Sequence, residues 1–562
     1  MDTTYKIAII AVILVLLLII KGVYDERQYK QRLLKRLKNT WGSPSRDEYS
    51  HELLESIKYY YRQNVSDGDI DDITCNDLDI DAVFMDLNHT MTSIGEEYLY
   101  ALLRKPCTDI SILEERENTI NYIQADENER IKLQMALAGM GKLNKVSVYS
   151  YIKTISSMDT GGKLYHILSG IALFVSLCLC MVKPAVMVLV TAIIIIHNVI
   201  TYYRSKAETD PYIQVFTFIA RIIRQSESVA EANIQGIGQY KERLVSCARC
   251  LKKFSSNSWL VAGGNMNGDL LDSLMDYIRI LFHIDLIKIC SMAEELKKHE
   301  KELIGIYNTT GYLDSMVSIA SFRAGTGSWC VPVLHRAASK RDITMEFTEL
   351  YHPLLDEPVK NSASADRSIL ITGSNASGKS VFIKTVALNA IFAQTIYTVL
   401  ADSYSSCFFN IYSSMALRDD IFSNESYYIV EIKSLKRIID KASKADIPVL
   451  CFIDEVLRGT NTLERIASSS KILEYIADAK AMCFAATHDL ELAKILSGRF
   501  DNYHFEEKVE ENNVVFDYKL RKGTTKTRNA IKLLEMIGYN QHITKGAEKA
   551  AQFFLENGFW PV

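Results

Sequence analysis

The segment from Ser368 to Ser380 constrains the fold of this chain more than any other stretch of its sequence. It reads SILITGSNASGKS, an apolar run followed by GxxxxGK[ST], and the apolar stretch VFIKTVALNAIFAQTI comes next. A strand, a glycine-rich loop and a helix in that order place backbone N–H groups around phosphate oxygens at a helix N-terminus. The sequence therefore predicts a P-loop within an α/β domain.

The loop supplies the expected nucleotide-binding residues. Lys379 would neutralise the β- and γ-phosphates, and the Ser380 hydroxyl would ligate Mg²⁺. ATP and Mg²⁺ are thus the expected cofactors. The full set that we expect to bind ATP is Gly373, Ser374, Asn375, Ala376, Ser377, Gly378, Lys379 and Ser380.

Two further apolar runs end in polar side chains. Val449–Ile453 is followed by Asp454 and Glu455, and Met482–Ala486 is followed, one residue on, by His488. Asp454 suits the water shell of Mg²⁺, and Glu455 suits a base that deprotonates the attacking water. His488 would lie at the same carboxyl edge of a parallel sheet, as a γ-phosphate sensor or as a structural strand-end histidine.

The amino terminus carries an uninterrupted apolar run, Ile7–Ile20, between Lys6 and Lys21. At about 1.5 Å per residue it extends roughly 21 Å, and the flanking residues bring it near the ~30 Å of a hydrocarbon core. The alternative is a secretory signal peptide. Because no small-residue cleavage site follows, we expect an uncleaved membrane anchor.

A second apolar block runs from Leu164 to Tyr203 and contains one formal charge, Lys183. Each of its halves, Ile167–Val182 and Ala185–Tyr203, is long enough to span a bilayer, with Lys183-Pro184 as the turn. A buried hairpin in a soluble core is the alternative, but so long a stretch has almost no polar face. We expect a transmembrane hairpin.

Basic residues orient these segments. Lysines and arginines follow the first span from Arg27 to Arg46, and Arg204 and Lys206 follow the third. The positive-inside rule then predicts a multi-pass protein of a membrane, the plasma membrane of a prokaryote, with its ATPase domain in the cytoplasm. The cluster Arg27–Lys38 favours anionic lipid headgroups, with a solvated helix face or nucleic acid as alternatives.

Composition sets the remaining limits. At 562 residues the chain is too long for one core, and 23% charged with 48% hydrophobic residues excludes a mainly disordered chain. A net charge of -4 gives no global basic surface for nucleic acid. The cysteines number 11 and suggest no disulfide framework; Cys247-x-x-Cys250 favours reduced helix thiols over a metal or redox site.

From Pro353 onward the sequence resembles the ATPase domain of the MutS family of mismatch-repair proteins, within the ABC class. The matching segments are YHPLL at Tyr351–Leu355, RDDIFSNESYYIVE at Arg418–Glu431, IDEVLRGTNT at Ile453–Thr462 and FAATHDLEL at Phe484–Leu492. Segments at 87–95, 102–106, 113–116 and 313–320 resemble the helical core, or lever, of that family. Residues 518–523 and 528–558 resemble its last strand and its dimerising helix pair.

The resemblance implies a dimer in which each ATP lies between two protomers. Ser426 would reach the γ-phosphate of the partner, and Thr460 and Asn461 would lie at the same interface. The chain departs from the family where it lacks a mismatch-reading domain and carries the apolar hairpin in place of a DNA clamp. Asn424-Glu425 also replaces the family's Gly-Arg pair.

The predicted fold is an α/β P-loop (ABC-type) ATPase domain with an all-α lever domain and three transmembrane helices. Its expected parts are a transmembrane anchor (1–25), a basic cytosolic helical linker (26–79), the first part of the helical core (80–163), the transmembrane hairpin (164–204), the second part of the helical core (205–345), the ATPase domain (346–528) and a C-terminal dimerising helix pair (529–562).

The expected function is that of a membrane-anchored, MutS-like ATPase that forms a homodimer. DNA with mismatches or branches is one expected partner. The alternative is an ATP-driven conformational switch that acts on the lipid bilayer or on a protein partner and binds no DNA. The missing reader domain and the net charge favour this alternative, and the resemblance favours DNA.

Overall fold

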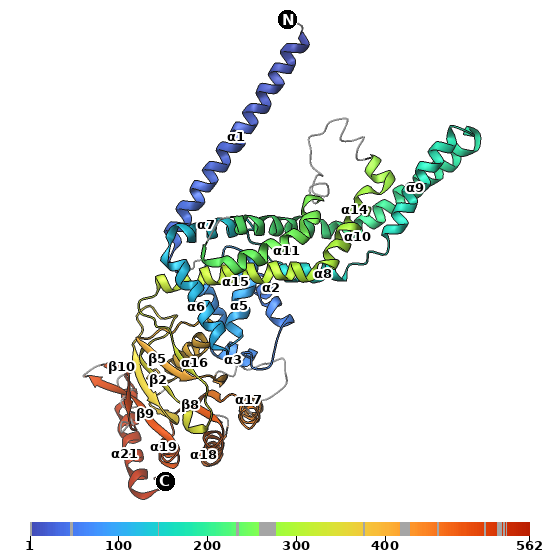
Figure 1. The fold of residues 1–562 in the computed structure, drawn as a ribbon. Helices are drawn as coiled ribbons and strands as arrows, with labels where there is room; N and C mark the ends of the chain where they lie inside the picture. Colours follow the sequence, from blue (N-terminus) through green and yellow to red (C-terminus); the bar gives the residue numbers. More distant parts are fainter. Residues whose placement is uncertain are drawn as a thin grey trace. The chain divides into compact units, whose positions relative to one another are not determined.

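The computed structural model describes residues 3–44, 49–143, 145–231, 235–257, 277–374, 377–415, 427–444, 446–457, 460–510, 513–524, 531, 534–535 and 537–561. The chain forms two compact units, one helical and one of mixed α/β structure, whose residues interleave along the sequence (Figure 1). The helical unit comprises Met1–Asn64, Leu87–Ala101 and Asn118–Gly325. The α/β unit comprises Val65–Asp86, Leu102–Glu117 and Thr326–Val562.

The helical unit contains several long helices, the longest being α10. Its helices are α1 (Thr3–Thr40), α2 (His51–Gln63), α7 (Glu127–Ala138), α8 (Val148–Ser157), α9 (Lys163–Cys180), α10 (Pro184–Glu231), the 3₁₀ turn η1 (Gln235–Ile237), α11 (Gly238–Asn257), α14 (Ile284–Lys298) and α15 (Glu300–Gly325). Two helices, α5 (Ser93–Arg104) and α6 (Ile110–Ala125), each contribute residues to both units.

The core of this unit forms around α15, which is buried along almost all of its length from Leu303 to Arg323. Buried carboxylates join it to its neighbours. Asp314 accepts hydrogen bonds from the backbone N–H and the hydroxyl of Thr92, at 2.9 and 2.6 Å. Tyr307 donates to Glu97 at 2.8 Å, and Glu97 also accepts from the N–H of Val148 at 2.5 Å, at the start of α8. These buried acids are satisfied by donors, as buried polar groups require.

The apolar block predicted as a hairpin folds as two helices, α9 and α10, joined by Met181–Lys183. Pro184 opens the second helix, where its missing N–H costs nothing. Lys163–Cys180 and Pro184–Thr209 are long and apolar enough to cross a membrane, and most of each is exposed. The predicted turn is confirmed. The helix that follows it does not end at Tyr203 but continues to Glu231, so the expected boundary at 204 lies inside one helix.

The predicted first span lies within α1, which runs unbroken from Thr3 to Thr40 and so also includes the basic cluster. Most side chains of Ile7–Ile20 lie outside the described residues, so the anchor stays a prediction.

The α/β unit contains two sheets. The smaller sheet has the order β1-β5-β2-β3, formed by β1 (Val333–His335), β5 (Ser403–Cys407), β2 (Met345–Leu350) and β3 (Asn361–Ala365). The larger sheet has the order β10-β9-β4-β8-β7-β6, formed by β10 (Asn513–Lys522), β9 (Phe500–Glu510), β4 (Ser368–Thr372), β8 (Ala481–Thr487), β7 (Val449–Asp454) and β6 (Asn410–Ser414). All its pairings are parallel except that of β10 with β9.

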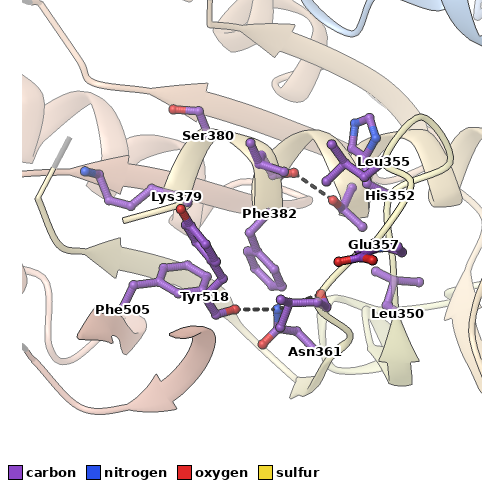
Figure 2. A pocket seen from close by; sticks show the side chains of 15 residues that line it. Leu350, His352, Leu355, Glu357, Asn361, Lys379, Ser380, Phe382, Phe505 and Tyr518 are labelled. Atoms are coloured by element: carbon purple, nitrogen blue, oxygen red, sulfur yellow. Dashed lines mark hydrogen bonds between the residues drawn. The ribbon is translucent and has the colours of Figure 1, made fainter. Parts of the chain in front are cut away.

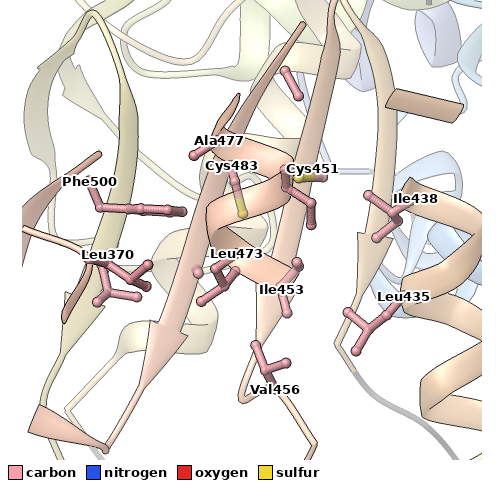
Figure 3. Packing of buried hydrophobic residues seen from close by; sticks show 14 of the residues in the cluster. Leu370, Leu435, Ile438, Cys451, Ile453, Val456, Leu473, Ala477, Cys483 and Phe500 are labelled. Carbon is pink, nitrogen blue, oxygen red and sulfur yellow. The ribbon is translucent and has the colours of Figure 1, made fainter. Parts of the chain in front are cut away.

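Helices cover the larger sheet because its central strands are apolar on both faces. Strand residues such as Cys451, Ile453 and Cys483 pack against α17 and α18 in one buried cluster (Figure 3). The opposite face of these strands carries the stacked rings of Phe452 and Phe484, with centroids 5.6 Å apart. The helices of this unit are α3 (Asp72–Asp77), α4 (Ile80–Leu87, which ends at its boundary), η2 (Lys340–Asp342), α16 (Lys379–Thr395), α17 (Tyr427–Ala442), α18 (Thr462–Asp478), α19 (Leu490–Ile495) and α21 (Gln541–Asn557).

The segment that begins at Val65 belongs to the α/β unit, although the sequence suggested a linker up to residue 79. The buried carboxylate of Asp77 accepts from the hydroxyl of Ser413 at 2.6 Å and from the N–H of Met415 at 3.0 Å. Asp71 pairs with Arg437 on α17 at 2.5 Å. The segment thus covers the β6 edge of the sheet, which would otherwise be open.

Candidate functional site

The predicted strand, loop and helix are present as β4, residues 373–378 and α16. Two glycines shape the loop. Gly373 has φ +153°, and a Cβ there would lie 2.7 Å from the Ser377 hydroxyl. Gly378 has φ +97°, and a Cβ there would lie 2.9 Å from the Tyr518 ring. Residues other than glycine would therefore distort the loop. Asn375 and Ala376 lie outside the described residues.

Lys379 is folded back onto the loop. Its side chain is buried, and Nζ donates to the carbonyl oxygens of Gly373 at 2.8 Å and Ser374 at 2.7 Å. The Ser377 hydroxyl also donates to the Ser374 carbonyl, at 2.8 Å, which tightens the same turn. Ser374 itself donates to Glu507 on β9 at 2.8 Å. The ammonium group is thus held at the centre of the loop, where phosphate oxygens would bind.

Ser380 and Asp454 face each other across the end of the sheet. The Ser380 hydroxyl, in the first turn of α16, donates to the Asp454 carboxylate at the end of β7 over 2.5 Å. Both groups present oxygen, the ligand type that Mg²⁺ prefers. The two predicted metal ligands are therefore brought together by the fold.

Glu455 and His488 follow neighbouring strands, β7 and β8, which are paired in parallel with Asp454 opposite Ala486. The N–H of Glu455 donates to the Ala486 carbonyl at 3.0 Å, and its backbone has φ +57°. His488 Nδ1 lies 3.4 Å from the Glu455 carboxylate. That contact raises the pKa of His488, and burial partly opposes the shift. The two strand ends meet as the sequence predicted.

A third acid, Asp489, and Arg465 on α18 support this pair. Arg465 donates through Nε and Nη2 to both oxygens of Asp489, at 3.0 and 2.9 Å, and His488 Nε2 lies 3.6 Å from Asp489. Such a two-point contact fixes the orientation of the Arg465 guanidinium and of the Asp489 carboxylate. The imidazole is thus placed between two carboxylates. Neither Arg465 nor Asp489 was predicted as a site residue, because nothing in their sequence spacing marks them as a pair.

A cavity of about 430 Å³ opens beside the loop (Figure 2). Its volume is in the range of small-molecule sites. The walls are mostly apolar and aromatic, with Phe382, Phe505 and Tyr518 among them, and its floor reaches Gly378, Lys379 and Ser380. The complete lining is Leu350, His352, Leu355, Glu357, Pro358, Val359, Asn361, Gly378, Lys379, Ser380, Val381, Phe382, Thr385, Phe505 and Tyr518.

The side chain of Asn361 holds Tyr518 at this cavity. It donates to the Tyr518 carbonyl at 3.0 Å and accepts from the Leu520 N–H at 2.8 Å, at an irregularity of β10. Asn361 was not predicted from the sequence, and Tyr518 was included there only within a stretch that resembles a known strand. Burial lowers the pKa of His352, another wall residue, to about 4, so this imidazole is neutral at pH 7.

The residues expected at a dimer interface are only partly described. Ser426 lies outside the described residues. Thr460 donates to Glu464 at 3.1 Å, and Asn461 caps α18 by accepting from the Glu464 N–H at 3.0 Å. Within one protomer these two residues therefore define the start of α18, and Asn461 is exposed there.

Comparison with known proteins gives matches that include this part of the chain. The family described as MutS domain V matches residues 369–554. Human MutS protein homolog 4 is 30% identical over 276 residues, which is 45% of this chain and 28% of that protein. The DNA mismatch repair protein MutS of Thermus thermophilus is 29% identical over 184 residues, 33% of this chain and 22% of that protein.

The protein of the same name from Pseudothermotoga lettingae is 32% identical over 204 residues, 35% of this chain and 25% of that protein. The matched part spans less than a third of the length of these relatives. The matched domain and these similarities support membership of the MutS family.

Proposed function

We propose that this member of the MutS family is a P-loop ATPase that hydrolyses ATP with Mg²⁺. The observation that carries the proposal is the 2.5 Å contact between Ser380 and Asp454 beside the buried Lys379, with Glu455 next in the chain. Phosphate-binding, metal-binding and proton-accepting groups thus lie at one edge of a parallel sheet, where such folds bind nucleotides.

Each side chain has a distinct part in this reaction. Lys379 would exchange its two carbonyl partners for phosphate oxygens. Ser380 and Asp454 would hold Mg²⁺, which when bound offsets the charge on the phosphates. Glu455 would orient the attacking water and accept its proton. His488, positioned by Asp489 and Glu455, would donate to the terminal phosphate.

The cavity beside the loop would hold the adenine ring and ribose. Its aromatic and aliphatic walls suit a flat base, and its floor is the P-loop that would bind the phosphates. Tyr518 offers the aromatic face nearest the loop, since its ring lies directly over Gly378. The base would stack on this ring.

The decisive experiment replaces Glu455 with Gln, which keeps the size of the side chain and removes its basicity. We expect turnover to fall about 10²–10⁴-fold, the usual contribution of a general base, with ATP binding retained. Glu346→Gln, which removes an exposed carboxylate from β2, is the matched control. Turnover within about two-fold of the wild type in Glu455→Gln would exclude this role.

The proposed ATPase acts as a homodimer with composite sites, to which Ser426, Thr460 and Asn461 of one protomer contribute at the nucleotide of the other. The family resemblance supports this arrangement, as does the aromatic end of the chain. There Phe554 and Trp560 stack with centroids 4.5 Å apart, and Trp560 remains exposed. Mass photometry of the Glu455→Gln protein with and without ATP tests it, since a nucleotide-dependent dimer should accumulate when hydrolysis is blocked.

The proposed location is a membrane, the plasma membrane of a prokaryote, with three spans and a cytoplasmic ATPase domain. The exposed apolar surface of α9 and α10 supports this assignment, with Leu164, Leu189 and Ile200 each more than 60% exposed. Such a surface is unusual in water. Arg27–Lys38 would bind anionic lipid headgroups. Resistance to alkaline extraction is the expected result, and it should be lost only when residues 1–25 and residues 164–204 are both deleted.

Two actions are open to this ATPase. The relatives named for DNA mismatch repair support action on mismatched or branched DNA. The exposed hairpin within the helical unit supports the alternative, a switch that acts on the membrane or on a protein partner. ATPase activity measured with homoduplex, mismatched and branched DNA across a salt series separates them. A DNA effect that fades with salt supports the first action, and indifference to every DNA supports the second.

A further inference from the structure

We infer that the helical unit carries a zinc-binding site formed by Cys250, His299 and Glu302. One potential ligand atom from each of these side chains lies within 4.8 Å of the other two. The site is in the other unit from the proposed ATP site and shares no residue with it, so the inference does not depend on the proposed function.

The fold, and not the sequence spacing, assembles this set. Cys250 lies on α11, His299 is the residue between α14 and α15, and Glu302 is in the first turn of α15. The helices α11 and α15 approach closely beside the cluster. A Cβ at Gly305 would lie 2.9 Å from the Cys247 sulfur, so this approach requires glycine.

The three donors have the chemistry of a zinc site. Thiolate, imidazole and carboxylate are the three ligand types that Zn²⁺ binds, at about 2.0–2.3 Å each. Ligand atoms around a tetrahedral ion are then roughly 3.5 Å apart, so the cluster needs to contract by only about 1 Å. A thiolate and a carboxylate would also balance the two charges of the ion.

The position of the imidazole supports this assignment. His299 Nδ1 lies 3.7 Å from Glu302, and Nε2 lies 3.8 Å from Glu295 on α14. If Nδ1 binds the ion beside Glu302, the Nε2–H group can donate a hydrogen bond to Glu295. In many zinc sites a carboxylate orients a ligating histidine in this way. Glu295 is therefore a positioning residue.

The site is accessible to an ion from solvent. The His299 side chain is 20% exposed and that of Glu302 is 34% exposed, and Cys250 is exposed. The neighbouring thiol of Cys247 is more enclosed than that of Cys250 and lies outside the group of three donors, so we assign the fourth position on the ion to water.

The test uses the full-length protein, purified in detergent without chelators and analysed for metal by mass spectrometry. We expect about one zinc per chain in the wild type and at least a ten-fold loss in Cys250→Ser and in Glu302→Gln. Cys107→Ser, a half-buried cysteine of the other unit, is the control and should keep its zinc. Circular dichroism verifies that each variant is folded.

A second readout depends on the identity of the ligands. The cobalt-substituted protein should show a thiolate-to-cobalt charge-transfer band that Cys250→Ser removes. Glu295→Gln should weaken zinc affinity about 10–100-fold without abolishing binding, as expected of an orienting carboxylate. A wild-type protein without zinc, or equal zinc in the wild type and in Cys250→Ser, would overturn the assignment. Neither result would bear on ATP hydrolysis, which rests on other residues.

Discussion

Replacement of Tyr518 by Ala should weaken ATP binding selectively through the base. The ring forms a wall of the cavity and covers Gly378, where a Cβ would come within 2.9 Å of Tyr518 Cδ1. Its backbone is held by Asn361, which contacts the main chain of residues 518 and 520 and not the ring. The substitution therefore removes the aromatic face and leaves the chain path in place.

The expected magnitude follows from this geometry. Stacking of a base on an aromatic side chain contributes about 1–3 kcal/mol when measured by alanine substitution. This corresponds to a roughly 5–150-fold increase in the Kd for ATP. The contacts of Lys379 and Ser380 do not involve the ring, so the affinity for inorganic triphosphate should be unchanged. Tyr518 has φ +51°, and alanine meets the same backbone strain, so the protein should gain no new conformational cost.

Titration calorimetry with ATP and with inorganic triphosphate measures both quantities. Tyr518→Phe is the matched control, because it keeps the aromatic face and removes only the hydroxyl. We expect Tyr518→Phe to bind ATP almost as the wild type does. If Tyr518→Ala weakens triphosphate as much as ATP, the ring supports the loop and does not stack on the base. If Tyr518→Phe is as weak as Tyr518→Ala, the hydroxyl and not the face carries the affinity. Either result would refute the reasoning.

Three further outcomes are expected. Gly378→Ala should lower ATP affinity at least ten-fold, because Gly378 has φ +97° and the new methyl group would meet the Tyr518 ring. The control is Gly498→Ala, which has open space around it and should bind ATP normally in the same calorimetric assay. Burial raises the pKa of Glu97 to about 8. The protonated carboxyl group therefore contributes its full stability below the ordinary glutamate pKa of 4.5, and this contribution is lost as the pH rises through 8. Glu97→Gln should therefore reduce the slope of the unfolding free energy of the helical unit against pH between 4.5 and 8, by up to about 1.4 kcal/mol per pH unit. Denaturant titrations at several pH values measure this slope. An unchanged slope would contradict the burial of this acid. Glu455→Gln should lower the pKa of His488 toward its ordinary value, because the contact with the Glu455 carboxylate is the main cause of the raised pKa. NMR titration of histidine-labelled protein measures this pKa. An unchanged pKa would show that the contact is absent in solution.

The sequence predicted those parts of the site that depend on local pattern. The apolar runs that became β4, β7 and β8 are buried on both faces, so their composition marks them as central parallel strands. Once these strands are parallel, Asp454 and His488 must meet at one edge. The Met181–Lys183 turn was equally predictable, because a charge and a proline interrupt an otherwise apolar block.

The parts that escaped prediction depend on contacts between distant segments. Asn361 and Tyr518 are far apart in the chain, and neither lies in a pattern that marks a binding wall. Asp77 lies in a short polar segment that has the composition of a linker, yet its carboxylate is buried against β6. Cys250 and His299 likewise meet only through the packing of α11 on α15. Pair contacts of this kind leave no periodic signal in one sequence.

The turn that follows β7 at the proposed ATP site contains two residues with strained backbones, and the contacts that hold this turn indicate what the site requires. Glu455 and Leu457 both have positive φ, at +57° and +58°, a conformation that costs about 1–3 kcal/mol for residues other than glycine. The Glu455 N–H donates to Ala486, and the Leu457 N–H donates to the buried Glu431 over 2.5 Å. In the proposed mechanism, Glu431 would thus act through the turn that presents the Glu455 carboxylate to His488, and not through contact with the nucleotide.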